Sequence, residues 1–106
     1  MELLRIIIDR PMGSARPAYP EHRYPVNYGY VPGIFAPDGE EQDAYVLGVA
    51  QPLREFYGKK IAVIHRRDDV EEKWVVCPPE QTFTLGEIEC AVAFQERYFD
   101  SIIELV

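Results

Sequence analysis

Apolar side chains in this chain gather in short runs of β-branched and aromatic residues separated by glycine, proline and charged positions, a pattern typical of strands joined by turns. The predicted strands cover residues 3–8, 27–31, 44–49, 60–66 and 73–77, with a hairpin loop at 67–72 and a further strand candidate at 101–106. Residues 11–25 contain four prolines, which fix φ and remove N–H donors. We therefore expect an irregular surface loop there.

One helix is predicted towards the end of the sequence. Thr84 and Glu87 lie three residues apart, the spacing at which a hydroxyl and a carboxylate satisfy free backbone N–H groups at a helix start. The apolar residues that follow at helical spacing are Leu85, Ile88, Ala91, Val92 and Tyr98. They predict an amphipathic helix of about three to four turns that packs on the sheet. The expected fold class is mainly β with one C-terminal α-helix.

Length and composition favour a single globular domain over residues 1–106. No apolar run is long enough to cross a bilayer, and the first residues lack the pattern of a secretory signal, so we expect a cytoplasmic protein. Cys77 and Cys90 have no CxxC spacing and predict neither a disulfide framework nor a zinc site. Both are expected to be buried free thiols.

The net charge of −7 repels nucleic acid and anionic membrane surfaces unless a local basic patch overrides it. The adjacent basic pairs are confined to residues 59–60 and 66–67. We therefore expect neither nucleic acid nor a membrane as a partner.

Acidic residues are concentrated in two short segments. They are Asp38, Glu40, Glu41 and Asp43 in the first, and Asp68, Asp69, Glu71 and Glu72 in the second. Mg²⁺ prefers oxygen ligands and takes only a few carboxylates, while water and substrate phosphate complete its shell. Two such loops brought together could hold Mg²⁺. The alternative is that both are solvated turns, since acidic residues favour loops.

The first acidic segment is one of two sequence motifs that occur at a characteristic spacing. Residues 24–30 read Tyr-Pro-Val-Asn-Tyr-Gly-Tyr, and residues 38–43 read Asp-Gly-Glu-Glu-Gln-Asp. Their order and spacing resemble the Tyr-Pro-x-Asn-Tyr-Gly-Tyr strand and the Asp-Gly-Asp-Pro-x-Asp signature of the Mg²⁺-dependent soluble inorganic pyrophosphatases. Weaker similarity at 8–14, 71–73 and 96–100 extends this resemblance over most of the chain.

The resemblance implies an OB-like, five-stranded β-barrel that hydrolyses pyrophosphate with Mg²⁺ and associates into homo-oligomers. The catalytic residues that it implies are Asp38, Glu40 and Asp43, with Glu40 accepting the proton of the attacking water. The implied metal ligands are Asp38, Asp43, Asp68 and Glu71. The implied substrate-binding residues are Tyr24, Tyr28, Lys73, Tyr98 and Arg16.

Three departures from the family pattern leave the function open. Glu40 stands where the family has aspartate, Phe99 stands where it has lysine, and the segment between Ser14 and Tyr24 is shorter than the family's basic hairpin. The first hypothesis is a Mg²⁺-dependent inorganic diphosphatase or a close phosphoanhydride hydrolase. The second is a non-catalytic metal- or phosphate-sensing module derived from that fold. A third is a structural, oligomer-forming barrel in which the acidic residues are solvated.

Overall fold

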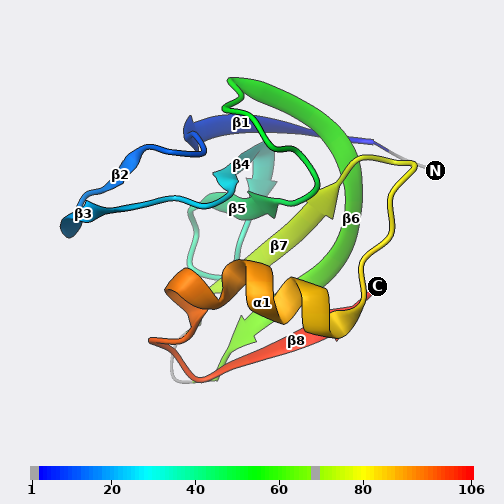
Figure 1. The fold of residues 1–106 in the computed structure, drawn as a ribbon. Coiled ribbons are helices and arrows are strands. Elements are labelled where there is room, and N and C mark those ends of the chain that lie inside the picture. The colour runs from blue at the N-terminus through cyan, green and yellow to red at the C-terminus, as the bar shows by residue number, and fades with distance from the viewer. Residues whose placement is uncertain (1–2, 68–69) are drawn as a thin grey trace.

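Five strands close into a barrel in the computed structural model, which describes residues 3–67 and 70–106 (Figure 1). They are β1 (Leu4–Arg10), β4 (Asn27–Phe35), β5 (Glu41–Val46), β6 (Glu55–Arg66) and β7 (Glu72–Cys77). β1 pairs with β4, β4 with β5, β5 with β7 and β7 with β6, and β6 returns to β1. The β5–β7 pair is parallel and the others are antiparallel. The prediction of a mainly β, five-stranded barrel is confirmed.

The long strand β6 pairs with two different strands along one of its edges. Residues 55–58 pair with β1 and close the barrel, whereas residues 62–66 pair with β8 (Ser101–Leu105). Figure 1 shows β6 curving through the barrel wall, with β8 alongside its last part. The strand candidate at the end of the chain is therefore confirmed.

A capping box formed by Thr84 and Glu87 sets the start of the helix α1 (Leu85–Glu96). The Thr84 hydroxyl accepts a hydrogen bond from the Glu87 backbone N–H at 3.2 Å, and the Glu87 carboxylate accepts one from the Thr84 N–H at 2.8 Å. Both donors would otherwise lack a partner within the helix. The predicted helix start is confirmed.

The helix covers one side of the barrel through a narrower apolar face than its sequence predicts. Ile88 and Val92 are buried against the sheet, and Ala91 is partly buried. Leu85 is 41% exposed, and Tyr98 lies beyond the last helical residue with 53% of its surface exposed. The two outer members of the predicted face are thus wrong, because Leu85 lies in the exposed first turn of the helix and Tyr98 lies beyond its end.

Alternating side chains of the strands supply two apolar clusters. The cluster beneath α1 contains Tyr45, Leu47, Ala62, Ile64, Val75, Ile88 and Val92. The second contains Ile6, Ile8, Val31, Ala44, Val46 and Val76. Tyr45 and Ala44, like Val75 and Val76, are consecutive residues that enter different clusters, as expected of strands whose side chains alternate between the two faces. The parallel pair β5–β7 is therefore buried on both sides.

The prediction of an irregular loop at 11–25 is wrong for the middle of that segment. Ala15–Arg16 (β2) and Tyr19–Arg23 (β3) pair as a short antiparallel hairpin that projects from the barrel (Figure 1). β3 is exposed throughout and belongs to a two-stranded sheet. Pro20 has no backbone N–H, but no inner strand of a larger sheet requires a hydrogen bond from it. The prolines therefore limit the hairpin to short edge strands without preventing it.

Several predicted strand limits also differ from the observed ones. β4 runs on to Phe35, β5 covers 41–46 instead of 44–49, and β6 begins at Glu55 instead of residue 60. In β4 the continuation passes through Gly33, whose φ of 79° accompanies a register shift against β5. Glycine adopts this conformation without the Cβ penalty, so the Pro-Gly pair bends the strand where a stop was expected.

The two cysteines differ in environment. Cys77 is buried, and this burial raises the pKa of its thiol. Cys90 is exposed on α1, so the expectation of two buried thiols is wrong for that residue. No helix within the described ranges is long and apolar enough to cross a membrane.

Candidate active site

A buried lysine and a half-exposed carboxylate form the centre of the site. Nζ of Lys73 donates a hydrogen bond to Oδ2 of Asp43 over 2.6 Å, with the two side chains 6% and 36% exposed. The parallel pairing of β5 with β7 sets Ala44 opposite Trp74, so Asp43 and Lys73, one residue earlier on each strand, are neighbours. The pairing of the strands therefore dictates this ion pair.

Tyr28 on β4 completes this central group. Its ring centroid lies 5.8 Å from Nζ of Lys73, and its hydroxyl is near enough to Asp43 for the charge of that carboxylate to affect its pKa. Burial first, and then the negative charge of Asp43, raise the pKa of Tyr28 well above 10. The hydroxyl therefore stays protonated as a donor. The structure brings these three predicted site residues together.

A second ion-pair network lies beside the first and is centred on the buried Arg66 at the end of β6. Its Nε and Nη2 donate to the two carboxylate oxygens of Glu96 at 3.1 and 2.8 Å, while Nη1 donates to Glu71. The guanidinium also lies over the ring of Phe99, with Cζ 3.7 Å from the centroid. Glu71, a predicted metal ligand, is therefore already bound to a fixed cation, and its Oε1 lies 3.6 Å from Nζ of Lys73.

Glu96 accepts more hydrogen bonds than the two from Arg66. The hydroxyls of Tyr45 and Ser101 also donate to its carboxylate, the latter at 2.8 Å. Burial alone would raise the pKa of Glu96, but the hydrogen bonds from Arg66, Tyr45 and Ser101 outweigh it and the pKa is lowered. Burial also raises the pKa of Tyr45, and the charge of Glu96 raises it further. Glu96 is thus a buried anion held by a cation and two hydroxyls.

Sequence reasoning missed both Arg66 and Glu96, although a periodic signal for each exists. Arg66 continues the alternation of the buried Ala62 and Ile64 along β6. Glu96 lies four residues, about one helical turn, beyond the buried Val92. A charged residue at a position that the period assigns to the core predicts a buried partner of opposite charge.

The acidic turn between β4 and β5 holds the remaining carboxylates of the signature. The Glu40 backbone N–H donates to Oδ1 of Asp38 at 3.0 Å, which fixes the turn. Beside it, a depression of about 310 Å³ is lined by Tyr30, Glu40, Glu41 and Asp43. Asp38 and Glu40 are exposed, so their carboxylates are open to solvent. The structure brings Glu40 and Asp43 to one depression, while Asp38 braces the turn next to it.

These carboxylates fit a hydrated divalent ion better than an enclosed one. Within residues 3–67 and 70–106, no three Asp, Glu, His or Cys side chains stand close enough together to enclose a metal. Asp68, a predicted ligand, lies outside the described residues, and Glu71 is turned to Arg66. Mg²⁺ keeps several of its waters and needs only one or two carboxylates. The donor chemistry of Asp38 and Asp43 fits that kind of binding.

The other predicted substrate-binding residues gather at the far end of α1. Tyr24 is buried, stacks on Tyr28 with centroids 6.0 Å apart, and meets the ring of Phe94 edge-on at 5.6 Å. Arg16 donates from Nη1 to the Phe94 carbonyl at 3.3 Å, and its Cζ lies 5.9 Å from the Tyr98 ring. The Tyr24–Tyr28 stack and the Tyr45 ring, which contacts both Phe94 and Tyr28, therefore link this group to the Asp43 site.

A comparison with protein families decides the affiliation of the chain. The family model described as inorganic pyrophosphatase matches residues 8–104. The chain belongs to the inorganic pyrophosphatase family. The match includes the Tyr28–Asp43–Lys73 group, the acidic turn and the Arg66 network, so all three lie within the inorganic pyrophosphatase domain. No curated protein matches the chain by sequence.

Solved inorganic pyrophosphatases share this fold at low sequence identity. The enzyme from Ehrlichia chaffeensis has 18% identity and a TM-score of 0.79, with 99% of this chain and 86% of that chain covered. That from Helicobacter pylori has 18% identity and a TM-score of 0.71, with 99% and 82% covered. That from Coxiella burnetii has 17% identity and a TM-score of 0.68, with 98% and 83% covered. These likenesses establish the barrel architecture.

Proposed function

We propose that the chain hydrolyses inorganic pyrophosphate, or a closely related phosphoanhydride, with Mg²⁺ as cofactor. Membership of the inorganic pyrophosphatase family supports the class of reaction. The observation that carries the proposal is the group of Asp43, Lys73 and Tyr28, in which a carboxylate, a fixed cation and a protonated hydroxyl adjoin an acidic depression. A polyanionic substrate needs cations and donors to bind, and a carboxylate site for the metal that offsets its charge.

Lys73 and Tyr28 are the proposed contacts for the phosphoryl oxygens. The ammonium group of Lys73 is held in place by Asp43, so little side-chain freedom is lost when an anion binds. Tyr24, Tyr98 and Arg16 are proposed to contribute further contacts from the aromatic group at the end of α1. Lysine and arginine then act as the positive charges and tyrosine hydroxyls as neutral donors.

Asp38 and Asp43 are the proposed first ligands of Mg²⁺, with Asp68 and Glu71 as additional ones. Mg²⁺, when bound, would supply positive charge at the phosphoryl oxygens and acidify water beside them. Glu40, exposed at the rim of the depression, is proposed to accept the proton of the attacking water. Its carboxylate is exposed to solvent, and this role requires contact with water.

Phosphate release from pyrophosphate, measured with and without Mg²⁺, tests the proposal. We expect release only with Mg²⁺, and a fall of at least about 10²-fold in kcat for Asp43→Asn, because an amide neither carries the charge nor ligates as well. Asp100→Asn is the matched control, since Asp100 also pairs with a cation, Arg67, but lies away from the depression. Absence of Mg²⁺-dependent release at high protein concentration would reject the proposal.

A non-catalytic metal- or phosphate-sensing module is the second candidate function. The observation that favours it is that Asp43 and Glu71 are neutralised internally by Lys73 and Arg66. Phe99, which stands at the lysine position of the family pattern, stacks on Arg66 instead of offering a charge. Calorimetry that detects Mg²⁺ or phosphate binding, together with no turnover, would favour this candidate over the enzyme.

We further propose that the chain acts as one domain and as a homo-oligomer in the cytoplasm. Support for association comes from β8, where Ile102 and Leu105 are 45% and 52% exposed on a strand that forms one end of the sheet order. Apolar residues on such a strand gain free energy when a second copy covers them. Sedimentation analysis at micromolar concentration tests this, and a monomer at all concentrations would contradict it.

A further inference from the structure

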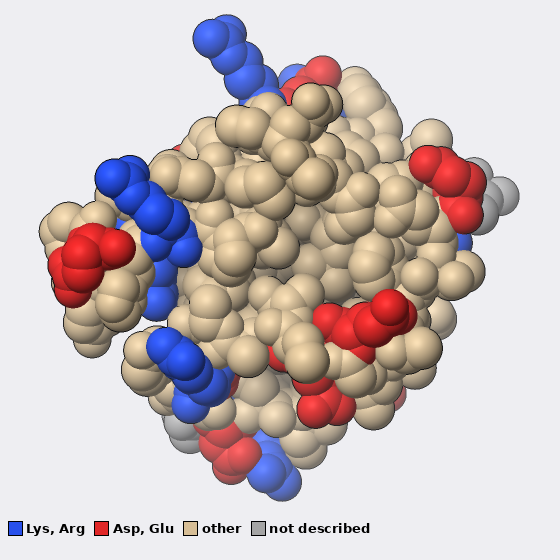
Figure 2. Space-filling model, viewed as in Figure 1, with Lys and Arg blue, Asp and Glu red and all other residues tan. Residues whose placement is uncertain are grey.

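Arg66 is the only buried arginine within residues 3–67 and 70–106, with 4% of its side chain exposed. Figure 2, in the view of Figure 1, shows lysine and arginine side chains near the outline of the molecule, where they reach solvent. A guanidinium donates hydrogen bonds in a rigid, planar fork, and burial removes the water that would compete for these donors. Arg66 is therefore suited to hold other side chains in place.

One nitrogen of Arg66 fixes Glu71, which directly precedes β7. Nη1 donates to Oε2 of Glu71, and the backbone N–H of Arg66 donates to the Glu71 carbonyl at 3.3 Å. Oε1 of Glu71 lies 3.6 Å from Nζ of Lys73, and the Glu71 side chain is 30% exposed. The carboxylate is thus held between two cations and is still open to solvent. A carboxylate fixed in this way loses little freedom when it binds a metal.

The other contacts of Arg66 fix the turn that follows α1. Nε and Nη2 donate to both carboxylate oxygens of Glu96, the last helical residue, and Cζ lies 3.7 Å from the centroid of the Phe99 ring. Between these two contacts, the N–H groups of Tyr98 and Phe99 donate to the carbonyls of Gln95 and Glu96 at 3.3 and 3.0 Å. The turn that carries Tyr98 is therefore held by Arg66 at both ends.

We propose that Arg66 is a positioning residue that keeps the metal side and the substrate side of the site in a fixed relative arrangement. It binds Glu71 with one nitrogen and the turn that carries Tyr98 with the rest of its guanidinium group. This role rests on the proposed function, in which Glu71 is an additional ligand of Mg²⁺ and Tyr98 is a contact of pyrophosphate. Phe99 stands at a lysine position of the family pattern, so this chain replaces a further charge by a ring that packs on Arg66.

Arg66→Lys separates positioning from a contribution to stability alone. Lysine keeps the positive charge beside Glu96, but its ammonium group reproduces neither the fork nor the stacking. Loss of stability alone would lower the melting temperature and leave the folded protein with the binding constants of the wild type. Positioning predicts that these constants change in the folded variant.

Three measurements on Arg66→Lys report on positioning. Mg²⁺ binding, measured by calorimetry without pyrophosphate, should weaken about threefold to tenfold, because the Glu71 side chain must then be ordered when the metal binds. KM for pyrophosphate at saturating Mg²⁺ should rise by a similar factor, because the Tyr98 turn must be ordered as well. Hydrogen exchange at the Tyr98 and Phe99 N–H groups should become faster, and this measurement requires neither metal nor turnover.

Phe99→Leu is the second variant, and it removes the ring while leaving the ion pairs of Arg66 intact. It should raise KM for pyrophosphate and accelerate exchange at the Tyr98 N–H, because one end of the turn is released. Its affinity for Mg²⁺ should stay within about twofold of the wild type, since Arg66 still holds Glu71. Phe99→Leu also decides the role of Arg66 if Arg66→Lys does not fold.

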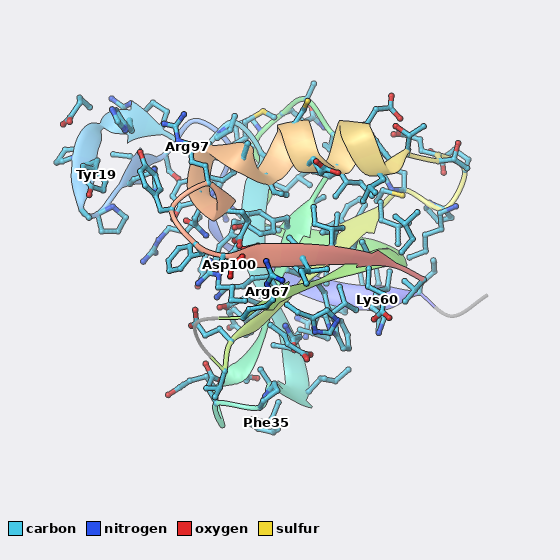
Figure 3. All side chains as sticks on the ribbon, turned by 90° about the horizontal axis from the view of Figure 1, so that it is seen from below. Tyr19, Phe35, Lys60, Arg67, Arg97 and Asp100 are labelled. Atoms are coloured by element: carbon cyan, nitrogen blue, oxygen red, sulfur yellow. The ribbon has the colours of Figure 1, made fainter. Side chains whose placement is uncertain are left out.

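Arg67→Lys is the matched control. Arg67 donates from Nε and Nη2 to Asp100 at 3.2 and 2.7 Å, but its side chain is 59% exposed. Figure 3 shows Arg67 beside Asp100, and Arg97 at the end of α1. In the described part of the chain, Arg67 forms no ion pair with Glu71 and no stacking contact with Phe99. The control should therefore leave all three measurements unchanged.

The outcomes distinguish the role of Arg66 from the proposed function. Equal changes in Arg67→Lys would overturn the positioning role, and so would wild-type values of all three measurements in both Arg66→Lys and Phe99→Leu. A wild type that releases no phosphate would reject the proposed hydrolysis. Mg²⁺ titration and hydrogen exchange would then still decide whether Arg66 holds Glu71 and the Tyr98 turn.

Discussion

The ammonium nitrogen of Lys73 lies 2.6 Å from Oδ2 of Asp43, on the neighbouring parallel strand. Asp43 is also the half-exposed carboxylate that adjoins the acidic depression. A divalent ion that binds Asp43 must therefore share it with an internal cation. The binding of Mg²⁺ and the binding of a phosphate anion are coupled through Lys73, because its ammonium group repels the metal ion and attracts the anion.

Lys73→Met is expected to separate these two effects. Removing the ammonium group should tighten Mg²⁺ binding about tenfold in the absence of substrate, since a repulsive charge close to the ligand is lost. The same change should raise KM for pyrophosphate. Calorimetric titration with Mg²⁺ measures the first effect. Lys60→Met is the control, because Nζ of Lys60 lies over the Trp74 ring and pairs with no carboxylate in the described chain. Weaker Mg²⁺ binding in Lys73→Met would contradict the competition.

Glu96→Gln is expected to destabilise the fold by about 3 kcal/mol, since it leaves the buried Arg66 with an incompletely compensated charge. Urea unfolding measures this free energy. The double variant Arg66→Met, Glu96→Leu should lose less than the sum of the single variants, because both charges leave the interior together. Additive losses would show that the two residues do not stabilise the fold as a pair.

The lowered pKa of Glu96 predicts how stability depends on pH. A carboxyl whose pKa is lower in the folded state contributes stability above its unfolded pKa, and this contribution disappears as the pH falls through the folded value. The unfolding free energy of the wild type should therefore decline as the pH drops below 4.5, the ordinary value for Glu96. The difference between the wild type and Glu96→Gln should shrink over the same range. A constant difference would contradict the assignment.

Hydrophobic periodicity located the barrel strands and the helix, although not all of their limits, because an element that packs on a core places apolar side chains at its own period. It was insufficient for the β2–β3 hairpin, since Pro20 is tolerated only on an exposed edge and edges cannot be recognised from one sequence. The motifs led to Asp43, Lys73 and Tyr28, which lie together. They did not lead to Arg66 and Glu96, because an ion pair between distant segments depends on tertiary contacts.

Gly29 and Gly86 offer a matched test of close packing beneath the site. A Cβ at Gly29 would lie 1.9 Å from the carbonyl oxygen of Ile7, whereas a Cβ at Gly86 would meet nothing within 4 Å. Gly29→Ala should therefore cost about 3 kcal/mol of stability and displace the adjacent Tyr28. Gly86→Ala should stabilise by about 0.5 kcal/mol, because alanine loses less backbone entropy in a helix. Thermal unfolding of both variants checks these opposite signs.

Glu40 is the carboxylate whose length is least suited to its proposed role. Its side chain is one methylene longer than the aspartate of the family pattern, and a displacement near one ångström can reduce a rate about 10²-fold. Glu40→Asp is therefore expected to raise kcat for pyrophosphate about tenfold, and Glu40→Gln to lower it, since an amide cannot accept the proton.

The neighbouring Glu41 provides the control for that comparison. It lines the same depression, but its carboxylate accepts a hydrogen bond from the Gly33 N–H at 3.0 Å and is therefore committed to the turn. Glu41→Asp should leave kcat unchanged or lower it slightly. If Glu40→Gln retains full turnover, Glu40 is not the proton acceptor. If Glu40→Asp and Glu41→Asp raise kcat equally, the gain does not come from the placement of the Glu40 carboxylate, because both substitutions shorten a side chain of the depression and leave its charge unchanged.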